Sequence, residues 1–460
     1  MCNNVVALGN ATADGAVLFG KNSDREPNEA HYLRAIPRAT HAPGSVVQCT
    51  YIEIPQVAET NAVLLAQPCW IWGAEMGTND QGVVIGNTAV YSKVPYETGP
   101  GLIGMDFLRL ALERANTARA ALDVITSLLE KYGQGGNDGF SFKFFYHNSF
   151  LIADATSAWK LETAGRQWVA QQIKDVGATT NALTITTQYD LASKDLVQYA
   201  IQQGWCKSPA DFNFKQCYGG PGFYPSYLYT LLGRGDQRQA RLMSLLNQNK
   251  GQLTPQIIMN ILRDHGASAA TDPNWSPGPG FFENTVCMHA GFGPIRVDQS
   301  CGSLVSRLTA TGQNHWATGS SAPCTGIFKP VWVDALPNTG PAPTGRYNHV
   351  SLWWRHESLH RAILQDYAHR LAAFHPEQAA LEAQFIADAL ARTTAPQADR
   401  LAFATTSFAQ ADALTQKWAN QMLTMPVQQA PPGLYTRAWN KFNKEASFVE
   451  GNTQAYTNMP

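Results

Sequence analysis

The first 25 residues alternate between apolar runs and turn-forming residues in a pattern typical of a β-hairpin. The apolar runs cover residues 5–8 and 16–19, and the segment between them is rich in Asn, Asp and Gly. The longer of two loops that fit this pattern pairs Cys2 with about Ser23, and the shorter one pairs it with about Pro27. Either register brings a thiol at the start of the chain beside the polar end of the second strand.

The rest of the chain shows strand patterns first, then helical ones, then strands again, and a helical end. Short apolar or alternating runs predict strands over 48–55, 62–66, 83–90, 142–152, 158–163, 167–172, 179–185, 285–289, 302–309, 316–318 and 327–333. A 3.6-residue period predicts helices over 102–132 (interrupted by a cap at 116–117), 236–247, 254–264 and 352–423. This order predicts a layered α+β fold of antiparallel sheets with helices packed outside.

Stretches rich in Pro, Gly and polar residues predict the connections between these elements. Residues 34–48 and 267–280 are predicted as loops, and 337–346 is the most linker-like stretch of the chain. It divides the sequence into residues 2–336 and a helical region, 347–460, that either packs on the first part or completes a single domain with it. The segment from Ala430 onward is predicted to drape over the body.

The balance of charges in the sequence argues against some classes of binding partner. The chain has 460 residues, 44% of them hydrophobic, with 34 basic against 35 acidic side chains. Nucleic acids and anionic membranes call for a basic excess or patch, so neither is an expected partner. Apolar runs stay below the ~20 residues of a membrane span. Lys21 and Asp24 interrupt any signal-like apolar region after Met1, which favours a cytoplasmic location.

Eight cysteines are scattered along the chain without a Cys-x-x-Cys motif. Most are predicted to be buried free thiols. Cys2 differs, because a thiol at the start of a chain gains little from core packing. Removal of Met1 would give Cys2 a free α-amine, whose pKa of about 7.7–8.0 suits a general base near neutral pH. Thiol and base would then share one residue, an arrangement known from N-terminal nucleophiles.

A second candidate site is the sequence His356-Glu357-Ser-Leu-His360, which matches the His-Glu-x-x-His pattern of zinc peptidases. On a helix the two imidazoles would share a face and could bind zinc, with Glu357 as base and Glu377 as a third ligand. The flanking residues 353–355 and Arg361 suit an amphipathic packing helix with exposed imidazoles. The motif therefore supports a zinc metallopeptidase only as an alternative.

Several long motifs resemble the secernins and the bacterial dipeptidases of peptidase family C69. They begin with Met1-Cys2 and continue over 19–25, 49–54, 70–79, 86–90, 131–136, 146–154 and 161–165. The resemblance runs through about residue 265 and is looser beyond it. It implies an N-terminal nucleophile (Ntn) hydrolase with a four-layer αββα sandwich, a helical C-terminal extension and a nucleophilic N-terminal cysteine that attacks amide bonds.

More distant relatives in that superfamily, the penicillin V acylases and bile salt hydrolases, imply roles for individual residues. Cys2 takes the place of the nucleophile and Asp24 that of the carboxylate on the second strand. Asn87 takes the place of the first asparagine in their pattern and Asn181 that of the second. An amide such as Asn87 is the type of donor that an oxyanion hole uses. Lys21 stands where those relatives carry arginine, which keeps the charge and loses the bidentate fork.

The last residue of that pattern is an arginine, which corresponds to Arg241 or, equally well, to Arg238. The resemblance implies no metal and no organic cofactor. We therefore expect a cysteine-type Ntn hydrolase, activated by removal of Met1, that acts as a dipeptidase on a small peptide or on an N-acyl amide. A non-catalytic interaction protein with an inert N-terminus, and assembly into a homo-oligomer, stay open as alternatives.

Overall fold

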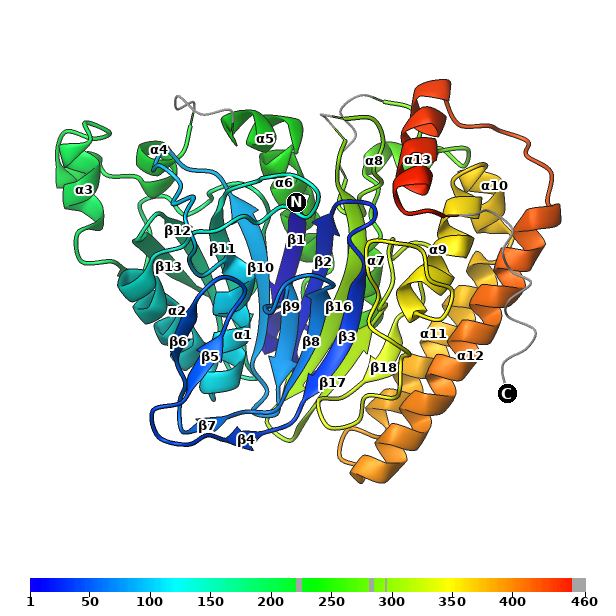
Figure 1. Ribbon diagram of the computed structural model, residues 1–460, viewed down its shortest axis with the longest axis horizontal. Coiled ribbons are helices and arrows are strands. Elements are labelled where there is room, and N and C mark those ends of the chain that lie inside the picture. The colour runs from blue at the N-terminus through cyan, green and yellow to red at the C-terminus, as the bar shows by residue number, and fades with distance from the viewer. Residues whose placement is uncertain (221–225, 281–284, 294–295, 449–460) are drawn as a thin grey trace.

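The computed structural model describes residues 1–220, 226–280, 285–293 and 296–448, and its centre is a pair of antiparallel sheets packed face to face (Figure 1). The first sheet has six strands. In spatial order they are β14 (Val176–Thr179), β1 (Cys2–Ala7), β2 (Val17–Arg25), β16 (Gln299–Thr309), β17 (Gly312–Ala317) and β18 (Lys329–Val331).

The second sheet has eight strands and lies against the first. In spatial order they are β15 (Leu191–Ala192), β13 (Gln167–Ile173), β12 (Ala158–Ala164), β11 (His147–Ala153), β10 (Val84–Val90), β9 (Met76–Asn79), β8 (Val63–Pro68) and β3 (His31–Ile36). Two short ribbons pair β4 (Ala39–Thr40) with β7 (Glu59–Thr60) and β5 (Val46–Gln48) with β6 (Glu53–Pro55).

Helices cover the outer face of each sheet. The eight-stranded sheet is covered by α1 (Gly104–Arg114) and α2 (Ala118–Tyr132). The six-stranded sheet is covered by α6 (Gly235–Gln248), α7 (Pro255–Leu262), α11 (His375–Leu390) and α12 (Gln397–Thr424). The expected four-layer αββα sandwich is confirmed.

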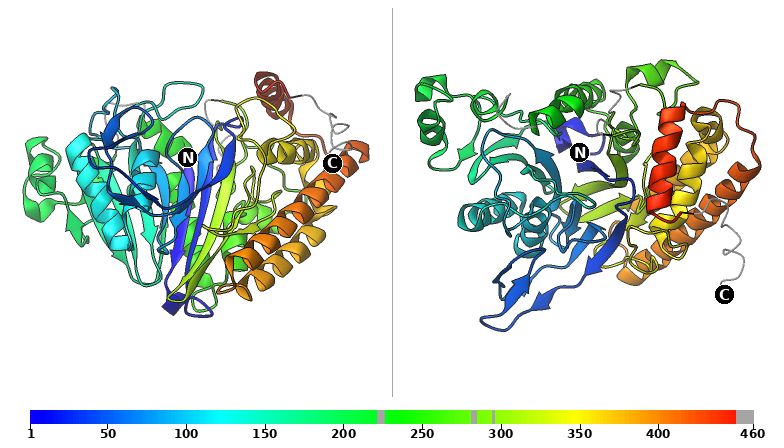
Figure 2. Two further views of the ribbon diagram at one scale, coloured as in Figure 1. Left: turned by 60° about the horizontal axis from the view of Figure 1, so that its bottom comes forward. Right: turned by 45° about the horizontal axis from the view of Figure 1, so that its top comes forward.

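The remaining helices lie around this sandwich. They are α3 (Leu196–Gln202), α4 (Phe214–Tyr218), α5 (Ser226–Leu232), α8 (Ala267–Thr271), α9 (Leu352–Ile363), α10 (Tyr367–Ala372) and α13 (Gly433–Glu445). The C-terminal helices pack on the edge of the six-stranded sheet, where α11 and α12 contact β18, as both views in Figure 2 show. The division of the chain into two regions near residues 337–346 stays a prediction.

The N-terminal hairpin lies in the interior of the sandwich. Cys2 pairs with Ser23, which is the register of the longer predicted loop. Both faces of β1 are buried: Val5 contributes to the core beneath α6 and α7, and Val6 to the core between the sheets. A strand buried on both faces forms a continuous apolar run, which explains the sequence pattern. The chain therefore begins inside the protein.

Several predicted boundaries are wrong, each for a local reason. The predicted loop 34–48 is interrupted by the end of β3, by β4 and by β5, and only 37–38 and 41–45 are irregular. β3 pairs with β8 as a partly exposed edge strand whose polar residues hide its pattern. The predicted strand 285–289 does not form. There the Val286 carbonyl accepts the side-chain amides of Asn3 and Asn22 instead of a neighbouring strand.

Other corrections concern the ends of elements. The predicted strand 142–152 begins only at His147, and 179–185 is extended only as far as Thr179. The loop 267–280 opens with α8, and the C-terminal segment contains α13. The cap in 102–132 is confirmed, since the Thr117 side chain accepts from the N–H of Ala120 and starts α2.

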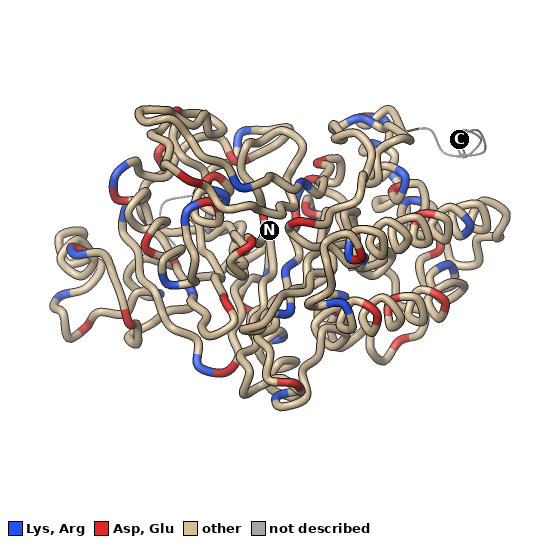
Figure 3. The backbone as a smooth tube through the Cα atoms, turned by 90° about the horizontal axis from the view of Figure 1, so that it is seen from below, with Lys and Arg blue, Asp and Glu red and all other residues tan. Residues whose placement is uncertain are grey.

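Basic and acidic residues alternate along the described part of the backbone without a large block of either sign, as the blue and red segments of Figure 3 show. This distribution agrees with the near balance of 34 basic and 35 acidic residues. Among the described residues, the structure contains no helix that combines the length and the apolarity of a membrane span.

Gly20 gives a direct test of the packing between the hairpin and α7. A Cβ at this position would lie 2.5 Å from Ile258 Cγ2 and 3.1 Å from Val5 Cγ2. We expect Gly20→Ala to lower the free energy of unfolding by about 1–3 kcal/mol, because the core would be overpacked. Urea denaturation measures this change. Gly99→Ala, at a site with no atom within 4 Å, is the control, and equal stability of the two variants would contradict this packing.

Candidate active site

A pocket opens at the start of the chain, where the two sheets meet. It encloses about 580 Å³ including its open mouth. Met1, Cys2 and Asp24 line it from the six-stranded sheet, and Glu75 and Asn87 line it from the eight-stranded sheet. The fold thus brings Asn87 to the start of the chain, although the two are far apart in the sequence.

Cys2 is the first residue of β1, and its side chain is 3% exposed. Its thiol donates to Glu75 Oε2 over 3.4 Å, and its backbone N–H donates to Asn181 Oδ1 over 3.1 Å. The nitrogen that would become the α-amine after removal of Met1 is therefore already held by Asn181. Thiol and nitrogen belong to one residue, so the strand fixes both at once.

Glu75, a residue that no sequence pattern marked as catalytic, is the charged centre of the site. Its Oε2 lies 3.2 Å from Lys21 Nζ, and its Oε1 lies 3.6 Å from Arg25 Nη1. Burial alone would raise the pKa of Glu75, but the two cations outweigh it and hold the pKa at about 2. Glu75 is therefore ionised at neutral pH, directly beside the thiol.

The charges around Cys2 do not stabilise its thiolate. Lys21 by itself would favour the thiolate, but its ammonium is engaged by Glu75 and by the Asn87 carbonyl. Burial and the Glu75 carboxylate together raise the pKa of the Cys2 thiol to about 11. While Met1 is present, the thiol is protonated at neutral pH.

Met1 occupies the pocket next to Cys2. Its ammonium donates to the backbone carbonyl of Asp24 over 2.5 Å and to Asp298 Oδ1 over 3.1 Å. The Asp24 carboxylate itself accepts from Asn3 Nδ2 at 2.8 Å and from Ser300 Oγ at 2.5 Å. Burial raises the pKa of Asp24 to about 7, although the nearby ammonium and Ser300 favour its charged form.

The Asn87 side chain reaches the pocket from β10. One of its N–H groups donates to Asn148 Oδ1 at 2.8 Å, and a carboxamide has two. The first residue of α1 must be small for this pair to fit, since a Cβ on Gly104 would lie 1.8 Å from Asn148 Oδ1 and 2.5 Å from Asn87 Nδ2. The arrangement can offer a fixed amide donor to a carbonyl oxygen.

Of the two candidate arginines, the structure places Arg238 beside Cys2. Its Nη1 donates to the Cys2 carbonyl at 3.2 Å, and its Nη2 donates to Asn181 Oδ1 at 2.7 Å. Arg241 lies one turn further along α6, where it pairs with Asp264 at 2.6 Å and is partly exposed. Arg238, and not Arg241, is therefore the arginine in contact with the candidate site.

The residues of the predicted zinc-peptidase motif lie in α9, away from this pocket. His356, Glu357 and His360 are all buried. Glu357 pairs with Arg361 at 2.7 Å, and the proposed third ligand, Glu377, instead binds Lys417 and Trp418. A catalytic zinc keeps one position open to water and substrate. The motif therefore lies in a packing helix, as the flanking residues indicated, but its imidazoles are buried and the expectation that they would be exposed is wrong.

The N-terminal half of the chain, which contains most of this site, matches a known protein family. Residues 1–223 match the model of peptidase family C69. The resemblance to this family is thereby confirmed for that segment. A probable dipeptidase of Salmonella dublin is 24% identical over 312 residues, which are 60% of this chain and 69% of that protein. A dipeptidase of Bifidobacterium longum is 27% identical over 205 residues, which are 38% of this chain and only 35% of that protein.

Solved structures that match this chain share little sequence with it. A conjugated bile acid hydrolase from Clostridium perfringens is 14% identical, with a TM-score of 0.40, and the match covers 68% of this chain and 88% of the other. A penicillin V acylase from Agrobacterium tumefaciens is also 14% identical, with a TM-score of 0.39, and the match covers 73% of this chain and 87% of the other.

The influence of Glu75 on the thiol can be tested in the chain that retains Met1. We expect Glu75→Gln to lower the pKa of Cys2 below about 11, because it removes a carboxylate and leaves Lys21 and the Met1 ammonium to favour the thiolate. The measurement is the rate at which iodoacetamide alkylates Cys2 as a function of pH, followed by peptide mass. Glu26→Gln, also on the pocket wall, is the control. An unchanged profile for Glu75→Gln would contradict the assigned coupling.

Proposed function

We propose that this protein is a cysteine-type Ntn hydrolase that cleaves dipeptides after Met1 has been removed. The observation that carries the proposal is the position of Cys2: its thiol and its backbone nitrogen lie together in a pocket at the start of a buried strand. The match to peptidase family C69 and the two dipeptidase relatives support a reaction at peptide bonds.

Met1 blocks this chemistry in two ways. It acylates the Cys2 nitrogen, which as an amide has no basic lone pair, and its own side chain and ammonium fill part of the pocket. Removal of Met1 creates an α-amine with an ordinary pKa of about 7.7–8.0. That amine is a base within the same residue as a thiol that burial keeps protonated, so deprotonation of the thiol and attack can be coupled.

In the proposed reaction the Cys2 thiol passes its proton to the α-amine while the sulfur attacks the substrate carbonyl. Asn87 donates a hydrogen bond to the oxyanion that forms. The ammonium then protonates the leaving amine as the C–N bond breaks, which leaves a thioester on Cys2. A water molecule, deprotonated by the same amine, hydrolyses the thioester and restores the thiol. Apart from the water molecule and the substrate, every group that takes part in these steps belongs to the protein.

The remaining residues of the site act through Cys2. Asn181 accepts a hydrogen bond from the nitrogen that becomes the base, and Arg238 fixes the Asn181 oxygen. Lys21 and Glu75 form a buried ion pair next to the sulfur. Asp24 fixes Asn3 and Ser300 and offers its backbone carbonyl to the pocket. We assign these five residues positioning roles.

The contacts of Met1 favour a peptide over an N-acyl amide as the substrate. Its ammonium is held by Asp298 and by the Asp24 carbonyl, two acceptors that removal of Met1 would release. The free α-amine of a dipeptide matches this pair of acceptors, because a carboxylate binds an ammonium more strongly than it binds a neutral acyl group. An N-acyl substrate would leave the Asp298 carboxylate without a cation.

The two forms of the N-terminus test whether the α-amine of Cys2 is the base. We expect a chain whose first residue is Cys2 to hydrolyse dipeptides, and a chain with an uncleavable residue before Cys2 to be inactive, because only the first has the base. Intact mass establishes the N-terminus, and release of amino acids from a dipeptide panel measures activity. Cys2→Ala is the control for the nucleophile. Hydrolysis that persists in Cys2→Ala or in the blocked chain would contradict the mechanism.

Substitution of Asp298 tests whether this carboxylate binds the free amine of the substrate. A charged hydrogen bond contributes about 1.5–3 kcal/mol, so we expect Asp298→Asn to raise KM for free dipeptides about 10- to 100-fold with a smaller change in kcat. The KM for the same dipeptides with acetylated amines should change little. Glu26→Gln provides the matched control on the pocket wall. An equal effect on free and acetylated substrates would show that Asp298 does not bind the amine.

A further inference from the structure

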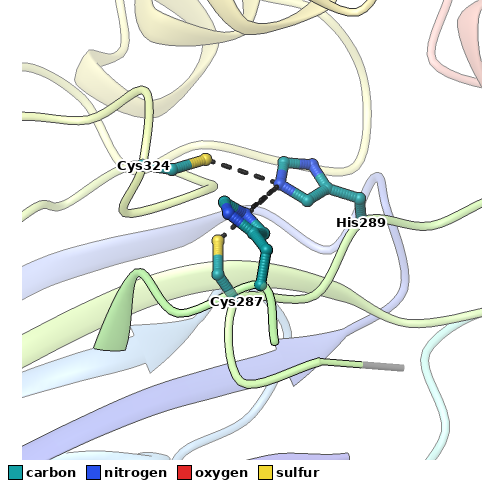
Figure 4. A group of neighbouring side chains, drawn as sticks. Cys287, His289 and Cys324 are labelled. Atoms are coloured by element: carbon teal, nitrogen blue, oxygen red, sulfur yellow. Dashed lines mark hydrogen bonds between the residues drawn. The ribbon is translucent and has the colours of Figure 1, made fainter. Parts of the chain in front are cut away.

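A compact group of two histidines and two cysteines lies outside the candidate active site. Its members are His265, Cys287, His289 and Cys324, and their ligand-type atoms all lie within 4.8 Å of one another. Figure 4 shows the Cys287 and Cys324 side chains turned toward the ring of His289. We propose that these four side chains bind a structural zinc ion.

The distances within the group fit a tetrahedral zinc site. Zinc–sulfur bonds of about 2.3 Å and zinc–nitrogen bonds of about 2.0–2.1 Å imply separations of roughly 3.3 Å between nitrogens and roughly 3.6 Å between nitrogen and sulfur. The Nε2 atoms of His265 and His289 lie 3.1 Å apart. From His289 Nε2 to the sulfurs of Cys324 and Cys287 the distances are 3.4 and 3.7 Å.

Hydrogen bonds alone do not explain why the polar atoms of the other three side chains all lie close to His289 Nε2. Three polar atoms lie within 3.7 Å of His289 Nε2, yet a neutral imidazole nitrogen carries either one proton or one lone pair. A cation at the centre would accept a lone pair from each of the four atoms. Two thiolates would also neutralise the two charges of Zn²⁺, which suits a site whose cysteines are buried.

The surroundings hold the two rings in place. The His265 ring stacks on Trp275 with centroids 4.5 Å apart, and Tyr367 of α10 lies edge-on to both imidazoles at 5.9 and 5.4 Å. A set of four protein ligands leaves no position for a substrate or a catalytic water, which is the arrangement of structural zinc sites. Tetrahedral S₂N₂ ligation also favours zinc over magnesium or calcium.

Zinc at this position would join three separate segments of the chain. His265 follows α7, Cys287 and His289 precede β16, and Cys324 lies between β17 and β18. Met288, between two of the ligands, exchanges hydrogen bonds with Ser300 in both directions at 2.9 and 3.0 Å. Because Ser300 binds the Asp24 carboxylate, the zinc site would also stabilise one wall of the pocket.

Metal analysis of the full chain tests the proposal without any variant. We expect protein reconstituted with Zn²⁺ and desalted to retain about one zinc per chain, and X-ray absorption to show two sulfur and two nitrogen neighbours. Replacement by Co²⁺ should produce sulfur-to-cobalt charge-transfer bands and the visible bands of a tetrahedral ion. Failure to retain zinc, absence of sulfur ligation, or a disulfide between Cys287 and Cys324 in the purified protein would overturn the proposal.

Variants then assign the ligands. We expect Cys287→Ser and Cys324→Ser to lose most of the bound zinc and to unfold at a lower temperature that added Zn²⁺ no longer raises. Cys217→Ser, a buried thiol outside the group, is the matched control and should retain the metal. Cys2→Ala should also retain it, which separates this site from the proposed nucleophile. Equal zinc retention in Cys287→Ser and Cys217→Ser would contradict the assignment.

Discussion

The central constraint on this protein is that its first strand lies in the interior of a sheet. β1 pairs with β14 on one side and with β2 on the other, and both of its faces are buried. The start of the chain is therefore fixed by two ladders of backbone hydrogen bonds, in contrast to the frayed termini of most domains. Whatever chemistry Cys2 performs, its sulfur and its nitrogen are held by the fold itself.

The second sheet supplies the polar groups that surround this fixed terminus. Glu75 directly precedes β9 and Asn87 lies within β10, and both reach the pocket around Cys2 only because the sheets pack face to face. The buried carboxylate would be costly by itself, and Lys21 and Arg25 offset that cost. Because the same carboxylate raises the pKa of the thiol, a base that acts during attack suits this site better than a stable thiolate.

The N-terminal hairpin and the layered α+β arrangement follow from the sequence, because a buried strand pair and amphipathic helices leave local patterns. The hairpin register does not follow from it, since two loops fit the pattern and only the structure selects the pairing of Cys2 with Ser23. The charges around Cys2 could not be predicted from the sequence, since Glu75 belongs to a segment whose local pattern is aromatic and Gly-rich. Arg238 and Arg241 are one helical turn apart, and only the docking of α6 on β14 decides which one reaches Cys2. The four side chains of the proposed zinc site come from three segments without a recognisable spacing, so only the tertiary structure reveals them.

Acid quenching of the enzyme during turnover of a dipeptide, followed by mass spectrometry of its N-terminal peptide, tests the central claim most directly. The proposed mechanism predicts that the N-terminal residue of the substrate is attached to Cys2, in a chain that begins at this residue. Continued hydrolysis with an unmodified N-terminal peptide, and equal turnover by Cys2→Ala, would contradict the mechanism.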